Sequence, residues 1–176
     1  MFIYVTDNLH EAKKAIDSGA TMIMVDLEEQ GKEERQASRN TRISKHNLKN
    51  VPSILKAVGT DSAMVRIDGP KVLDFQILDE LLRYGVTRFM VPMWETIEQL
   101  QKIQEYCEKS SLIDRGNLLN IVPLIETWAS LKLISKLEKF EYPWAHFGLN
   151  DLSLEINCEN MFDIMDYTAF RSACKN

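Results

Sequence analysis

The sequence has few of the features that mark secreted or membrane proteins. Its three cysteines are odd in number and show no C-x-x-C spacing, which argues against a disulfide framework or a zinc site and favours a reducing compartment. No apolar run reaches the about 18 residues that a membrane span needs, and the start of the chain lacks the basic segment and apolar core of a signal peptide. We therefore expect a cytoplasmic protein with no membrane partner.

Positive charge is scarce as well. The chain has 21 Lys and Arg against 26 Asp and Glu, a formal net charge of −5. Because a nucleic-acid-binding protein needs a basic face, we expect no nucleic-acid partner. The length of 176 residues and the hydrophobic content of 45% are ordinary for one globular domain, which we assign to residues 1–176.

Hairpin signals are also missing, and strand-like runs alternate with helix-like ones. Apolar runs typical of strands occupy residues 2–6, 21–27, 63–67, 89–91, 118–125 and 144–148. Segments with helical spacing of apolar residues lie between them, at 9–16, 48–58, 73–84, 97–107 and 131–140. Six strand-then-helix units without hairpins predict a parallel sheet with helical crossovers.

Two architectures compete for such a pattern. A doubly wound open sheet places its site at one switch point, whereas a (β/α)8 barrel gathers side chains from the ends of many strands. Polar residues follow most of the strands here, at Asp26, Glu28, Arg66, Glu126 and Asp151. We therefore expect the TIM-barrel type, although six βα units and 176 residues fall short of the eight units and about 250 residues of a full barrel.

The strand that ends at Glu126 carries the most informative acid. Residues 118–125 are almost entirely apolar, as in a strand covered on both faces, and Glu126 follows directly. Desolvating an unpaired carboxylate costs several kcal/mol, so Glu126 needs a cation or a metal. The strand at 144–148 leads in the same way to Asp151, which brings two acids to one edge of the sheet.

Together these strand ends resemble the HpcH/HpaI aldolase and citrate lyase β-subunit family, a TIM-barrel family of the phosphoenolpyruvate-dependent superfamily. The matching pieces span almost the whole chain in the family's order: Met24-Val-Asp-Leu-Glu28, Gly31-Lys-Glu-Glu-Arg35, Val65-Arg-Ile67, Val91-Pro-Met93, Leu124-Ile-Glu-Thr127 and Phe147-Gly-Leu-Asn-Asp-Leu152.

The resemblance implies a metal-dependent carbon–carbon lyase of aldolase type. In the family, the residues that match Glu126 and Asp151 bind a divalent metal, and Mg²⁺ or Mn²⁺ suits such carboxylates. Arg66 matches an arginine suited to hold a substrate carboxylate or enolate oxygen, and Asp26 and Glu28 are expected beside the substrate. The substrate implied is a 2-oxo acid or a related acyl compound, cleaved through a metal-stabilised enolate.

Three departures from the family pattern concern the general base and the end of the barrel. Glu29 stands where the aldolases have a histidine base, and Arg83 where an aspartate orients it. Glu29 and His46, which lies in the long loop after the second strand, are the candidates for the base. The last two strands of the family pattern are missing, so the copy is incomplete or another chain completes the barrel.

Several alternatives stay open. Glu126 and Asp151 could be solvated acids, Arg66 could be an ion-pair partner of Asp26 or Glu28, and His146 is expected to be a core histidine. The chain could be a truncated, catalytically inactive relative that acts as an interaction or structural module. Unpaired sheet edges favour pairing with another chain, and we expect a homo-oligomer. A third hypothesis is a doubly wound binding domain of receiver type, in which acids at strand ends also hold Mg²⁺.

Overall fold

The structure is a computed structural model that describes residues 1–29, 46–112, 119–140, 142 and 144–174. Six strands form one parallel sheet: β1 (Ile3–Val5), β2 (Met22–Asp26), β3 (Ala63–Arg66), β4 (Arg88–Val91), β5 (Asn120–Ile125) and β6 (His146–Phe147). The segment Gly31–Arg35 of the family motif lies outside the described residues.

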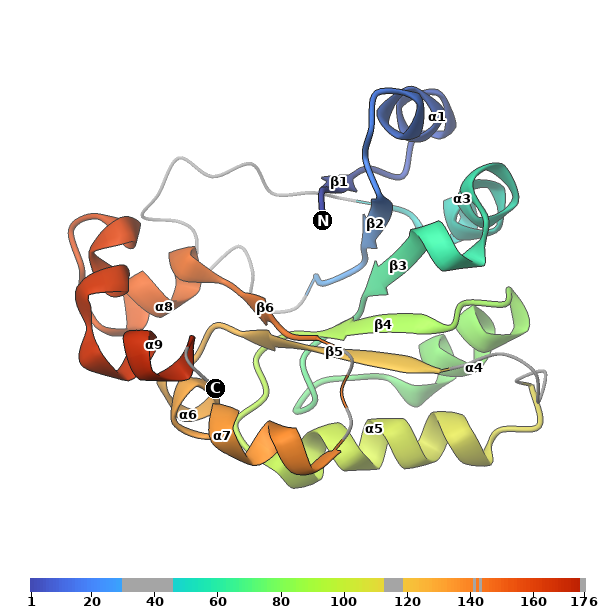
Figure 1. Ribbon diagram of the computed structural model, residues 1–176. Coiled ribbons are helices and arrows are strands. Elements are labelled where there is room, and N and C mark those ends of the chain that lie inside the picture. The colour runs from blue at the N-terminus through green and yellow to red at the C-terminus, as the bar shows by residue number, and fades with distance from the viewer. Residues whose placement is uncertain (30–45, 113–118, 141, 143, 175–176) are drawn as a thin grey trace.

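The order of the strands decides between the two expected architectures. Each strand pairs with the next one along the chain, β1-β2-β3-β4-β5-β6. A doubly wound sheet reverses direction at a switch point, and this sheet does not. The sheet curls with helices on its convex side (Figure 1). The fold is therefore of the (β/α)8 barrel type with six βα units, as the sequence predicts.

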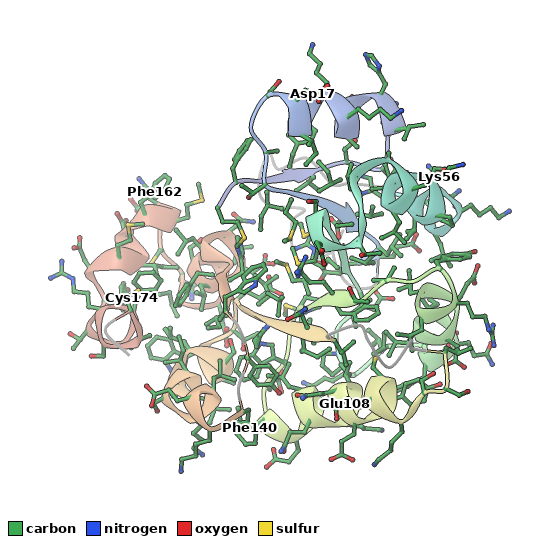
Figure 2. All side chains as sticks on the ribbon, turned by 45° about the vertical axis from the view of Figure 1, so that its right-hand side comes forward. Asp17, Lys56, Glu108, Phe140, Phe162 and Cys174 are labelled. Atoms are coloured by element: carbon green, nitrogen blue, oxygen red, sulfur yellow. The ribbon has the colours of Figure 1, made fainter. Side chains whose placement is uncertain are left out.

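Helices follow the strands where the apolar spacing predicts them. In the described residues, the helices between successive strands include α1 (Leu9–Asp17), α3 (Val51–Val58), α4 (Phe75–Arg83), α5 (Ile97–Lys109) and α6 (Trp128–Lys132). Side-chain caps start several of them: Asn8 accepts from two backbone N–H groups of α1, and Asp74 accepts from Gln76 N. Charged residues such as Asp17, Lys56 and Glu108 project from the outer side of these helices (Figure 2).

The chain after β5 departs from the expectation. Instead of one helix over 131–140, α6 is followed by α7 (Ile134–Leu137) and the 3-10 turn η3 (Glu138–Phe140). The helix begins earlier than its apolar spacing indicates because Thr127 caps it, accepting from Ser130 N at 3.0 Å. Beyond β6, where the sequence pattern weakens, the chain forms α8 (Leu149–Glu155), η4 (Met161–Asp166) and α9 (Thr168–Ala173).

Side-chain alternation along the strands gives the sheet two apolar faces. One core fills the space between sheet and helices and contains Ile23, Val25, Val65, Phe89 and Ile125. The other lies on the concave face and consists of Met22, Met24, Met64, Met90, Val122 and Leu124. Since Asp26, Arg66 and Glu126 continue the second series, they project from the concave face at the carboxyl ends of the strands. This is where barrel enzymes carry their sites.

Two remaining expectations concern the cysteines and the membrane. Cys107 is buried, Cys158 is half-buried and Cys174 is exposed, and no disulfide bond joins any two of these described cysteines. Within the described ranges, no helix has the length and apolar character required to cross a membrane.

Candidate functional site

The ends of β2 and β3 are joined by a buried ion pair. Asp26 and Arg66 are register partners, and the carboxylate accepts from Arg66 Nε at 2.8 Å and Nη2 at 2.7 Å. Arg66 Nη1 lies 3.5 Å from a carboxylate oxygen of Glu28. Burial acts to lower the pKa of Arg66, but the hydrogen bond to Asp26 and the surrounding negative charges raise it above its usual value. Arg66 is thus an ion-pair partner of Asp26 and Glu28, and its side chain is 17% exposed.

Glu126 is buried directly after β5, with 3% of its surface exposed. Burial raises the pKa of its carboxyl to about 8, and the charges of Glu28 and Asp151 act in the same direction. Arg66 and a hydrogen bond from the Met93 N–H oppose this rise without cancelling it. Glu126 is therefore not a solvated acid. Its carboxyl group is buried away from water and lies near other negatively charged side chains.

The turn after β4 fixes the orientation of Glu126. Met93 N donates to Glu126 Oε1 at 2.9 Å, and Met93 has a φ of 51°, which is rare for a residue with a side chain. Next to it, Thr127 Oγ1 donates to the Trp94 carbonyl at 3.2 Å. Two hydrogen bonds thus join Met93 and Trp94, after β4, to Glu126 and Thr127, after β5. The unfavourable φ of Met93 occurs at the residue whose N–H binds the Glu126 carboxylate.

Asp151 lies in the first turn of α8, not at the end of a strand. The sequence places it after a strand of 144–148, but β6 ends at Phe147, and Gly148 is already the N-cap of α8. The prediction of a strand-end acid is wrong in this respect, although Asp151 still acts electrostatically on Glu126. Asp151 Oδ1 is buried and has no hydrogen-bond partner in the described part of the chain. Such an atom is costly unless a cation satisfies it.

These features fit a divalent metal. Within the described ranges there is no group of three or more His, Cys, Asp or Glu side chains arranged for a metal ion. Mg²⁺ does not need one, because it is bound through one or two carboxylates and keeps several waters. The unpartnered Oδ1 of Asp151 and the raised pKa of Glu126 both indicate missing positive charge at this place. Glu126 and Asp151 are therefore the residues suited to hold it.

Glu29 and His46, the sequence-based candidates for the base, lie elsewhere. They line a cavity of about 120 Å³ together with Leu27, Leu48, Ile67, Asp68, Leu73 and Ile77. Leu27 and Ile67 belong to the core between sheet and helices, so this cavity lies on the convex side. Glu29 is exposed and its N–H donates to Asp68 Oδ1 at 2.9 Å. Neither residue makes a side-chain hydrogen bond to Glu126 or Asp151 that the structure describes.

The proton of His46 can be placed from its contact with Asp26. The Asp26 N–H donates to His46 Nδ1 at 2.8 Å, so a neutral His46 carries its proton on Nε2. In that tautomer the ring offers a donor at its far side. A role as base would require this backbone hydrogen bond to break.

His146 is a residue whose position the sequence analysis missed. It is exposed, not in the core, and it pairs in register with Leu124 of the concave face. Although the residue is exposed, loss of water around part of the ring and the positive charge of Arg66 lower the pKa of its imidazole. Strand alternation could have placed it, since Leu124, Glu126 and His146 share one face.

A family model described as HpcH/HpaI aldolase/citrate lyase matches residues 1–172. The chain belongs to the HpcH/HpaI aldolase/citrate lyase family. The motif-based resemblance is therefore confirmed over almost the whole chain. A search of curated proteins finds no match to the sequence.

Several solved structures, among them two HpcH/HpaI family proteins, share the fold of this HpcH/HpaI family member. An HpcH/HpaI aldolase from Desulfitobacterium hafniense DCB-2 has a TM-score of 0.70 at 14% identity, over 99% of this chain and 71% of that one. An HpcH/HpaI aldolase/citrate lyase family protein from Burkholderia cenocepacia J2315 has a TM-score of 0.67 at 12% identity, over 99% of this chain and 72% of that one. Macrophomate synthase has a TM-score of 0.66 at 15% identity, over 99% of this chain and 67% of that one. At these identities the likeness shows the fold.

Proposed function

We propose that this HpcH/HpaI family member is a divalent-metal-dependent carbon–carbon lyase that acts on a 2-oxo acid or a related acyl substrate. The observation that carries the proposal is that the buried Glu126 lies within electrostatic reach of both Arg66 and Asp151, and that Asp151 Oδ1 is buried without a hydrogen-bond partner among the described residues. Family membership supports aldolase or lyase chemistry. The metal, the substrate and the residue roles are our proposal.

Glu126 and Asp151 would hold Mg²⁺ or Mn²⁺. When bound, such an ion acts as a Lewis acid that polarises substrate oxygens and stabilises the negative charge that develops as a carbon–carbon bond breaks. The Met93 N–H fixes one oxygen of Glu126, which leaves Oε2 for a ligand. Because ligand carboxylates must be ionised, Glu126 would hold such an ion only in its deprotonated form.

Arg66 would bind the carboxylate or enolate oxygen of the substrate. Asp26 holds the guanidinium at two points, so its plane is fixed before any ligand arrives. Nη1 faces Glu28 at the looser distance of 3.5 Å and is the nitrogen from which a ligand oxygen could be bound. In this arrangement Asp26 and Glu28 are orienting residues next to the substrate, which refines the sequence-based expectation for them.

The acid–base group is a choice among Glu29, His46 and His146. Glu29 and His46 line the convex-side cavity, and Nδ1 of His46 is committed to the Asp26 N–H. His146 lies on the concave face within the electrostatic reach of Arg66, and its lowered pKa keeps it neutral at pH 7. A neutral imidazole on the side of the substrate is suited to accept a proton, so we propose His146 as the base.

Proton exchange at the methyl group of pyruvate tests this function without knowledge of the natural substrate. The protein with Mg²⁺ should exchange the pyruvate methyl protons for deuterium in D₂O, followed by proton NMR, and chelation should abolish the exchange. Glu126→Gln and Asp151→Asn should abolish it too, while Glu108→Gln on the outer side of α5 should not. If the wild-type protein binds Mn²⁺ yet neither pyruvate nor oxaloacetate reacts, the lyase proposal is lost while the metal site stands.

A further inference from the structure

The position of Asp151 is opposed by electrostatic repulsion. Asp151 lies in the first turn of α8 and acts on Glu126 as a like charge. When both are ionised, the two carboxylates repel each other, and burial strengthens the repulsion because it excludes water from Glu126 and from the Oδ1 atom of Asp151. α8 therefore needs attachments that keep Asp151 in its place.

α8 is too short to determine its own position. It has seven residues, and its N-cap, Gly148, provides no side-chain hydrogen bond. Isolated helices of fewer than about 12 residues are marginally stable in water, so the place of α8 depends on contacts with its neighbours. Gly148 N donates to the Ile125 carbonyl at 2.9 Å, and the side chain of Leu152 is buried in the core between sheet and helices. Both contacts act on the first half of the helix.

The far end of α8 is attached through Glu155. Its Oε2 atom accepts a hydrogen bond from the main-chain N–H of Trp128 at 2.5 Å. Trp128 is the first residue of α6 and stands two positions after Glu126. A helix cannot satisfy its own first N–H groups, and a bond from such a group to a carboxylate is stronger than one to a neutral acceptor. α6 and α8 both lie at the end of the sheet where β5 and β6 stop (Figure 1).

Asp151 and Glu155 are four residues apart on this helix. Residues at positions i and i+4 of a helix project from the same face. One face of α8 thus presents a carboxylate within electrostatic reach of Glu126 and a second carboxylate that binds the main chain of Trp128. The attraction at Glu155 therefore acts on the same side of the helix as the repulsion at Asp151, and can oppose it.

We propose that Glu155 is a positioning residue of the metal site: its hydrogen bond to the Trp128 N–H holds α8 so that Asp151 stays within reach of Glu126. Glu155 is exposed and would touch neither the metal nor the substrate. The inference rests on the proposed function, in which Glu126 and Asp151 are the ligands. Loss of a group that orients a metal ligand typically costs about 10–100-fold in metal affinity.

Two substitutions that remove the same charge isolate the hydrogen bond of Glu155. Glu155→Gln keeps an oxygen acceptor for the Trp128 N–H, whereas Glu155→Met, of similar length, does not. Titration calorimetry should show that Glu155→Met binds Mn²⁺ about tenfold more weakly than Glu155→Gln. Glu159→Gln, which removes another exposed acid shortly after α8, should bind Mn²⁺ as the wild type does.

Amide hydrogen exchange tests the attachment in the metal-free protein. Leu152 N donates to the Gly148 carbonyl at 3.2 Å within α8, so its exchange reports whether the helix stays in place. The amides of Trp128 and Leu152 should exchange faster in Glu155→Met than in Glu155→Gln. Equal exchange in the two variants overturns the inference, and so do equal Mn²⁺ affinities. If the wild type binds no Mn²⁺, the proposed metal-dependent function is lost, and the exchange rates alone decide whether Glu155 holds α8.

Discussion

Gly148 lies so close to Glu126 that a Cβ at position 148 would stand 2.7 Å from the Glu126 Cβ and 2.9 Å from its Oε2. The φ of Gly148 is −93°, so any residue could adopt its backbone conformation. Space, not backbone freedom, is therefore what requires glycine at this position. The main-chain bond from Gly148 N to the Ile125 carbonyl, at 2.9 Å, keeps the two segments together.

Gly148→Ala should therefore displace the Glu126 carboxylate, because the added methyl group would overlap with it. We expect Mn²⁺ binding to weaken by about tenfold or more, which corresponds to a loss of about 1.4 kcal/mol of binding free energy. Titration calorimetry measures the loss. Gly19→Ala is the control, since nothing lies within 4 Å of its Cβ position but its φ of 98° strains an alanine. That variant should lose stability and keep its Mn²⁺ affinity, and equal losses of affinity in both would contradict the account.

The raised pKa of Glu126 predicts how the stability of the metal-free protein depends on pH. The pKa rises from 4.5 in the unfolded chain to about 8 in the fold, chiefly through burial. Between these values the folded protein holds a proton that the unfolded chain has lost, so the free energy of unfolding falls as the pH rises. Urea unfolding at pH 5.5 and pH 8 should show this fall.

Glu126→Gln isolates that contribution. A glutamine can still accept from the Met93 N–H but carries no charge. The difference in unfolding free energy between variant and wild type should grow in favour of the variant from pH 5.5 to pH 8. A difference that is constant with pH would show that Glu126 does not titrate in this range.

Removal of Arg66 should be more damaging than removal of the whole ion pair. Arg66→Met removes the guanidinium that contacts Asp26 and Glu28, which are 2% and 3% exposed, and should cost about 3–5 kcal/mol of unfolding free energy. Combining it with Asp26→Leu should restore part of that loss, since no charge then remains at Asp26. Additive losses in the double mutant would contradict the coupling.

The charge of Arg66 should also be visible in the titration of His146. Partial loss of water and, after it, the positive charge of Arg66 lower the pKa of the imidazole below its usual 6.5. Arg66→Met should raise it, because a positive charge that disfavours protonation is removed. NMR titration of the His146 ring signals in the wild type and the variant measures the two pKa values. If the pKa of His146 is unchanged in Arg66→Met, the charge of Arg66 does not act on this imidazole.

Much of this arrangement could be predicted from residues 1–152. Apolar runs and alternation located all six strands, and the residues that follow them located Asp26, Arg66 and Glu126 at one sheet edge, because parallel strands end on the same side. The sequence also allows the ion pair of Arg66 with Asp26, since both residues lie at the ends of neighbouring strands. What sequence alone could not fix was which of its possible partners Arg66 contacts.

The errors have local physical causes. The apolar run before Asp151 predicts that this residue follows a strand end, but β6 has only two residues and α8 begins at Leu149. The apolar neighbours of His146 predict a core position, but its strand lies at the end of the described sheet. The Met93 contact with Glu126 depends on a positive φ in a residue other than glycine, for which the sequence has no signal.

Binding of Mn²⁺ at pH 8, followed by electron paramagnetic resonance, tests the central claim most directly. The account predicts one bound Mn²⁺ per chain, uptake that weakens as the pH falls below about 8 and Glu126 keeps its proton, and loss of binding in both Glu126→Gln and Asp151→Asn. Lys71→Gln, in an exposed ion pair with Glu95, should bind as the wild type does. Absence of bound Mn²⁺ in the wild type, or binding that survives both carboxylate substitutions, would contradict it.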